Sequence, residues 1–214
     1  MATIINRYRP VTQPRLPSAP AQYDPQFIEQ YSNVLRLYFS QLDNLTGVVL
    51  GEVGGRFIRF PYGAFSSDQD QTATANTATL MTLNTTDFSN DVSISSSKIS
   101  VANAGIYNLQ FSAQFQNTDT AFQDVYIWLR QNGVDIPGST GFISVPNRHA
   151  GTDGHSIIGW NYFLEMNASD YVEIYWSVPN AAVTIQHLAA SGTPTKPSTQ
   201  SVVATLSFVS ALAT

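Results

Sequence analysis

The hydrophobic and polar positions of the chain follow two different periods. After Asp24 the apolar residues recur at alternating spacings of three and four, which predicts one amphipathic α-helix. From Val48 onward this period disappears, and short runs alternate between apolar and polar residues, as the two faces of a strand do. We therefore expect three parts, which are residues 1–23, a helix over 24–47 and a β domain over 48–214.

The expected helix has clear ends and a repeating apolar seam. Asp24 is a suitable N-cap, Pro25 stands at the first helical position, and Gly47 marks the end. Three heptads of a coiled-coil seam follow, formed by Ile28, Tyr31, Leu35, Tyr38, Leu42 and Leu45. Such a seam packs either on its own domain or against symmetry-related copies. Further apolar residues beside the seam favour a helix that does both, and we assign five seam residues, Ile28, Tyr31, Leu35, Tyr38 and Leu42, to a trimer interface.

Residues 1–23 have the composition of an extended arm. Four prolines at spacings of three or four, namely Pro10, Pro14, Pro17 and Pro20, block helix and sheet hydrogen bonding. Both a disordered tail and an arm that docks on a partner agree with this composition. Apolar and basic side chains favour the docked arm, and the predicted anchoring residues are Ile4, Ile5, Arg7, Tyr8, Arg9 and Arg15.

The β region contains roughly eight short strands without a helix between them, which predicts an all-β antiparallel sandwich or barrel and excludes a parallel α/β fold. Gly105–Phe115 is the clearest strand, because from Tyr107 its apolar and polar residues alternate. Phe122–Leu129 is apolar on both faces, and Asn132-Gly133 after it is a strong signal for a hairpin turn.

A strand that is apolar on both faces lies in the middle of a sandwich or against another subunit. We therefore assign Tyr126 and Trp128 to the trimer interface as well. Ser156–Met166 and Tyr171–Val178 are expected to pair with each other across residues 167–170. Two further strands, Val183–Leu188 and Val202–Val209, complete the set.

Composition narrows the class of protein. Charged residues make up 12% of the chain, about half of the roughly 25% of typical soluble domains. There is no Cys, which excludes disulfides, thiol nucleophiles and thiolate metal sites. The net charge of −5 argues against nucleic acid as a partner. It is unevenly placed: six basic and four acidic residues give residues 1–60 a charge of +2, and the remainder carries −7.

The sequence shows no apolar run of membrane-spanning length and no signal-peptide pattern at its start. We expect a soluble protein that is made in a reducing cytoplasm and has no membrane partner.

Candidate chemistry is sparse. His149, Asp153 and His155 resemble a two-histidine, one-carboxylate metal set, although a solvated polar loop accounts for them better. Asp119 and Asp124 alone would supply too few oxygen ligands for calcium, which prefers six to eight. Aspartates that stabilise turns by accepting hydrogen bonds from backbone amides explain these two residues better. No nucleophile, phosphate-loop or zinc-protease motif occurs. We predict neither an enzyme nor a cofactor or metal site.

Several motifs, taken in order, resemble one family. The strand Gly105-x-Tyr107-x-Leu109-x-Phe111 is similar to the Gly-x-Tyr-x-Phe strand of the trimeric jelly-roll heads of complement q-type and tumour necrosis factor-like proteins. Later matches are Trp128 through Gly133, Leu164 through Asp170 with Val172, and Ala204 through Phe208, so that the resemblance covers approximately residues 61–210. It implies a jelly-roll sandwich behind the arm and the helix, and a homotrimer.

The resemblance also implies a setting, because similar heads follow N-terminal anchoring segments in bacteriophage virion proteins. We expect a capsid decoration or cement (head fibre) protein, assembled in the host cytoplasm and present in the virion. Its basic arm would lie across the major capsid protein or another virion protein.

Two alternatives stay open. One is a tail-fibre or receptor-binding tip that recognises a host surface glycan or protein. Its candidate contacts are Tyr126, Trp128, Trp160, Tyr162, Tyr171, Tyr175 and Trp176. The other, less favoured because no motif supports it, is a glycoside hydrolase on a jelly roll.

Overall fold

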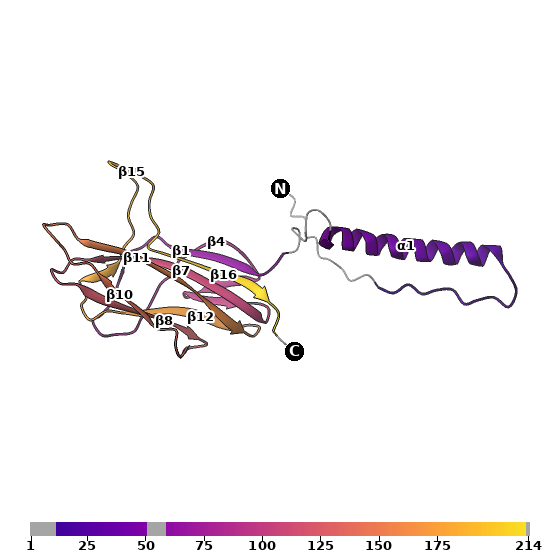
Figure 1. Cartoon of the computed structure of the whole chain (residues 1–214), viewed down its shortest axis with the longest axis horizontal. Helices are drawn as coiled ribbons and strands as arrows, with labels where there is room; N and C mark the ends of the chain where they lie inside the picture. Colours follow the sequence, from indigo (N-terminus) through magenta and orange to yellow (C-terminus); the bar gives the residue numbers. More distant parts are fainter. Residues whose placement is uncertain (1–11, 51–58, 213–214) are drawn as a thin grey trace. The chain divides into compact units, whose positions relative to one another are not determined.

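The protein was analysed as a computed structural model that describes residues 12–50 and 59–212 (Figure 1). The chain divides into two compact units, Met1–Arg59 and Phe60–Thr214. The first unit contains the helix α1 (Pro25–Leu50), and the described strands all lie in the second unit, the head. The division between the two units falls between Arg59 and Phe60.

Local capping explains where α1 begins. The backbone amide of Gln26 donates to the Asp24 carboxylate at 2.9 Å, and that of Ile28 donates to the Asp24 carbonyl at 3.2 Å. The helix ends at Leu50 and not at Gly47, the expected end. A single glycine lowers helix stability by only about 1 kcal/mol relative to alanine, so the helix continues through it.

Eight strands of the head form four nested antiparallel pairs. The first strand β1 (Tyr62–Ser67) pairs with the last, β16 (Val202–Ser210). Inside this pair, β6 (Lys98–Val101) pairs with β12 (Tyr171–Ser177), β7 (Gly105–Asn117) with β11 (Gly154–Met166), and β8 (Gln123–Gln131) with β10 (Gly141–Val145). This nested pairing, distributed alternately over two sheets, is the connectivity of a jelly roll. The expected all-β jelly-roll sandwich is confirmed.

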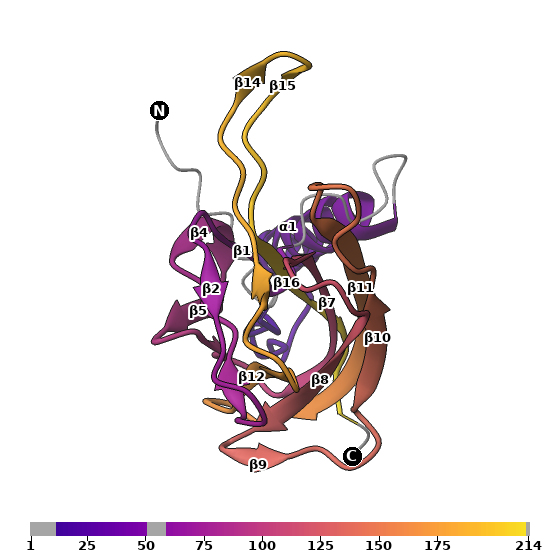
Figure 2. The same ribbon diagram turned by 90° about the vertical axis from the view of Figure 1, so that its left-hand side faces the viewer.

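The two sheets pack face to face (Figure 2). Sheet A runs β11-β7-β16-β1-β4, and sheet B runs β10-β8-β12-β6-β5. The other members of the two sheets are β2 (Gln71–Thr72), β3 (Thr79–Leu80), β4 (Thr85–Asn90), β5 (Val92–Ser95), β9 (Val134–Asp135) and β13 (Val183–Ile185). A ribbon of β14 (Ser191–Gly192) and β15 (Thr195–Lys196) projects away from the sandwich.

The core lies between the sheets. Its largest fully buried side chains include Trp176, Tyr107, Phe65, Phe115, Met81 and Ile99. In β7 every second residue, from Tyr107 to Phe115, points into this core, as the alternating sequence predicted.

One turn was predicted correctly and one pairing wrongly. Asn132 and Gly133 have positive φ angles of 53° and 80° and join β8 to β9 as a hairpin. The expected pair Ser156–Met166 with Tyr171–Val178 is wrong, because β11 pairs with β7 in sheet A while β12 pairs with β8 and β6 in sheet B. Residues 167–170 therefore cross between the sheets.

Asp170 stabilises this crossing. Its carboxylate accepts hydrogen bonds from the Asn167 amide at 2.7 Å, the Asn132 side chain at 2.8 Å and the Gln131 side chain at 3.2 Å. Burial raises the pKa of Asp170, but these hydrogen bonds to the charged form outweigh it, and the pKa lies below its usual value. The carboxylate thus connects the crossing to the β8–β9 hairpin.

The lowered pKa of Asp170 predicts how stability depends on pH. A carboxylate with a lowered folded-state pKa contributes stability that is present above the unfolded-state pKa, near 4, and lost as pH falls through the folded-state pKa. We expect Asp170→Asn to lower the free energy of unfolding at pH 7 by about 1–2 kcal/mol and to flatten the loss below pH 4. Urea denaturation from pH 7 to pH 3 measures both effects. The exposed carboxylate control, Asp43→Asn, should behave as wild type, and an unchanged acid response in Asp170→Asn would contradict the assignment.

Candidate functional site

The outer face of sheet A carries apolar side chains that nothing in the head covers. Strand register places the outward residues of β11, β7 and β16 in rows, for example Phe163 beside Asn108, and Gly159 beside Ser112 and Val203. Ile157 is 73% exposed and Phe163 56% exposed. We call this surface the sheet A face; it consists of Ile106, Asn108, Gln110, Ser112, Gln114, Ile157, Gly159, Asn161, Phe163, Glu165, Val203, Thr205 and Ser207.

The sheet A face is almost free of charge. Glu165 is the one charged residue among these outward positions of the three strands, all of which the structure describes. Neutral amides and hydroxyls occupy most of the remaining positions. Exposed apolar groups with few charges are the composition of the core of a protein–protein interface.

A hollow lies in the middle of the sheet A face. Gln110, Phe111, Ser112, Val203 and Thr205 line a space of about 260 Å³. Gly159, opposite Ser112, contributes no side chain to this row. The face therefore offers both protruding side chains and a depression that a side chain of a second molecule fits.

The helix α1 carries the second apolar surface, described here within the first unit alone. Ile28 is 47% exposed, and Tyr31, Leu35, Tyr38 and Leu42 are half-buried. The arm lies beside the middle of the helix, where Gln13, Pro14 and Leu16 line one hollow of about 270 Å³ with Leu35, Tyr38 and Phe39. The arm thus contacts the predicted seam.

The other predicted interface and anchoring residues are scattered. Ile4, Ile5, Arg7, Tyr8 and Arg9 lie outside the described residues, and Arg15 is exposed. Tyr126 and Trp128 lie on the outer face of sheet B, on the side of the sandwich opposite the sheet A face. Sequence reasoning missed Ile157 and Phe163. Each stands next to a core residue of the same strand, and this run of consecutive apolar residues was the available signal.

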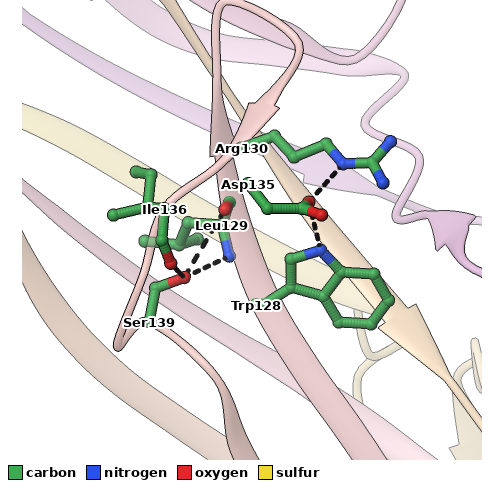
Figure 3. Close-up of polar contacts among 6 residues, drawn as sticks. All are labelled: Trp128, Leu129, Arg130, Asp135, Ile136 and Ser139. Carbon is green, nitrogen blue, oxygen red and sulfur yellow. Dashed lines mark hydrogen bonds and ion pairs between the residues drawn. The ribbon is translucent and has the colours of Figure 1, made fainter.

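A polar cluster holds Trp128 in place (Figure 3). The Asp135 carboxylate accepts a hydrogen bond from the Trp128 indole nitrogen at 2.7 Å and pairs with Arg130 at 2.5 Å. These two donors, Arg130 first, lower the pKa of Asp135. The Arg130 guanidinium lies 3.9 Å from the centre of the Tyr175 ring, which stacks on Trp128. The cluster thus fixes the positions of two aromatic rings on sheet B.

The aspartates considered for metal binding are engaged by neighbouring side chains. The Asp119 carboxylate accepts hydrogen bonds from the side chains of Gln123 and Asn180 at 2.7 and 2.6 Å. Asp153 pairs with Arg148 at 3.3 Å and accepts a hydrogen bond from Gln116 at 2.7 Å. Within residues 12–50 and 59–212, no three His, Asp or Glu side chains gather closely enough to hold a metal ion. In the same ranges no helix has the length and hydropathy to cross a membrane.

Among known proteins, the similarities of this chain are to solved structures. Neither a protein-family model nor a curated protein sequence matches the chain. Among solved structures, the globular domain of zebrafish complement 1qA protein is similar to this chain, with a TM-score of 0.42 and 12% identity, over 72% of this chain and 100% of that domain.

Proposed function

We propose that this protein is a homotrimeric structural protein of a bacteriophage virion, a capsid decoration or cement protein that displays a jelly-roll head and binds the shell through its N-terminal arm. The observation that carries the proposal is the sheet A face, where exposed apolar side chains occur with a single charged residue. Burial of such a face against a second copy removes apolar surface from water at little electrostatic cost. The role is structural and not enzymatic.

The first unit supports the same assembly. Its helix repeats apolar residues with the heptad period of a coiled coil; of these Ile28 is exposed within the unit and the others are half-buried, while Leu37 and Phe39 beside them are exposed. Helix and head thus each offer an apolar surface for self-association. We propose three copies in the assembly because the head sequence resembles those of trimeric jelly-roll heads.

The opposite charges of the two parts support the anchoring role. The arm contains Arg7, Arg9 and Arg15 and no acidic residue before Asp24. A guanidinium forms two parallel hydrogen bonds with a carboxylate, which suits an arm that lies on acidic shell subunits. The proposed location in a virion rests on the same sequence resemblance as the proposed trimeric state. The arm is the part of the chain that would bind the shell.

Two measurements on the purified full-length chain test the proposal. Light scattering should give three times the chain mass of 23.4 kDa, whereas a monomer mass would refute the assembly. Co-sedimentation with empty capsids should be lost when Arg7, Arg9 and Arg15 are all replaced by alanine. The matched control replaces three basic residues of the head, Lys98, Arg148 and Lys196, and should still bind. Equal binding by both triple variants would exclude the arm as anchor.

A further inference from the structure

The outer face of sheet B carries a continuous group of aromatic rings. Phe142 on β10 stands opposite Tyr126 on β8, with ring centres 5.9 Å apart, and Trp128 stands opposite Tyr175 on β12, also at 5.9 Å. Tyr126 and Trp128 are two residues apart on one strand, so they share a face and lie about 7 Å from each other. We call these four rings the aromatic face.

Part of the aromatic face is open to solvent and part is held rigid. Phe142 is 68% exposed and Tyr126 is 42% exposed. Trp128 and Tyr175 are half-buried. Asp135 accepts a hydrogen bond from Trp128 (Figure 3), and its partner Arg130 lies over the Tyr175 ring, so both rings are held in position. Rings that are already ordered lose little conformational entropy when a ligand binds.

Charged groups lie within the aromatic face and along its edge. Glu173 lies opposite Arg130 and only 5% of it is exposed, yet Arg130 pairs with Asp135 instead. Among the described residues no ion pair reaches the Glu173 carboxylate. Asp124 accepts a hydrogen bond from Ser144 beside Tyr126. The Asp124 and Asp135 carboxylates and the Arg130 guanidinium are therefore open to solvent beside the rings, whereas Glu173 is buried.

The combination of aromatic rings and charged groups indicates which class of ligand this surface would bind. The core of a protein–protein interface is enriched in aromatic residues and arginine but depleted of Asp and Glu. The sheet A face carries a single carboxylate, whereas Asp124, Asp135 and Glu173 all lie beside the aromatic face. A saccharide instead presents C–H groups that pack on aromatic rings, and hydroxyl groups that donate to carboxylates and accept from a guanidinium. We propose that the aromatic face binds an oligosaccharide chain, with Phe142, Tyr126 and Trp128 as the stacking platform and Asp124, Asp135 and Arg130 as its polar partners.

The proposal is independent of the shell-binding role. In a face-to-face sandwich the outer faces of the two sheets point in opposite directions, so copies that associate through the sheet A face leave the aromatic face uncovered. Sugar binding is therefore expected both in the assembled protein and in a variant that no longer assembles.

Calorimetric titration of the full-length protein with cellohexaose, chitohexaose, maltohexaose and mannohexaose tests the proposal. At least one is expected to bind with a dissociation constant of about 1 mM or tighter, with a change in tryptophan fluorescence from Trp128. Phe142→Ala and Tyr126→Ala should each weaken that binding at least tenfold. Phe88→Ala, which removes a 62% exposed ring from an edge strand of sheet A, is the control and should bind as wild type.

Three outcomes would overturn the proposal. The first is no binding of any of the four saccharides at millimolar concentration. The second is a loss of binding in Phe88→Ala as large as in Phe142→Ala, which would place the site elsewhere. The third is a change in the mass of the assembled protein on Phe142→Ala. Such a change would mean that Phe142 is buried between copies and that the aromatic face is a protein interface. Circular dichroism spectra that match wild type ensure that a loss of binding is not a loss of folding.

Discussion

Phe163→Lys is expected to dissociate the assembled protein. Phe163 is 56% exposed on the sheet A face, and in the proposed trimer it is covered by a second copy. A lysine there would bring an ammonium group into an apolar interface, where Glu165 is the one carboxylate on the outward positions of the three strands. A cost of about 3 kcal/mol corresponds to a roughly 100-fold rise in the dissociation constant. Sedimentation equilibrium over a range of protein concentrations measures it.

Phe142→Lys is the matched control for that substitution. Phe142 is also an exposed phenylalanine on an outer strand face of the head, but it belongs to sheet B. The proposed assembly predicts an unchanged mass for Phe142→Lys and dissociation for Phe163→Lys. The opposite result would move the interface to sheet B, as the sequence-based assignment of Tyr126 and Trp128 had it. Dissociation by neither variant would leave α1 as the surface that joins the copies.

The sequence predicts the parts of this fold that depend on local patterns. Alternation fixed the inward and outward residues of β7, and Asn132-Gly133 formed the expected hairpin because both residues adopt positive φ. The sequence does not predict which strands pair with each other. Residues 167–170, for example, suit either a hairpin or a crossing between sheets. Which of these forms is decided by pairing with β7 and β8, which lie far from β11 and β12 in sequence.

Interface residues are also difficult to predict from local sequence patterns. The assignment of Tyr126 and Trp128 to a trimer interface, made because their strand is apolar on both faces, stays a prediction. Within one chain Trp128 stacks on Tyr175 and donates a hydrogen bond to Asp135. In β11, Ile157 stands beside Ile158 and Phe163 beside Leu164, so this strand is also apolar on both faces. The period of a strand shows which residues share a face. It does not show which of two apolar faces is turned toward the core, because the other sheet decides that.

Trp176→Ala is expected to lower the free energy of unfolding by about 3–5 kcal/mol, a large part of the roughly 5–15 kcal/mol that stabilises a domain. Trp176 is fully buried between the sheets and packs on Phe115 with ring centres 5.7 Å apart. Alanine would remove these contacts and leave a cavity. Urea denaturation in a Phe163→Lys background would separate this effect from the concentration dependence of an oligomer.

Trp176→Phe is expected to cost much less than the loss of ring volume alone suggests. The indole nitrogen of Trp176 is buried and has no hydrogen-bond partner within the described part of the chain. Leaving such a donor buried costs about 1–3 kcal/mol, and phenylalanine removes the donor while it keeps a ring against Phe115. The net loss should be about 1 kcal/mol, from a transfer and cavity cost that the removed donor partly offsets. A loss as large as that of Trp176→Ala would mean that the nitrogen is hydrogen-bonded in solution, for instance to a buried water molecule.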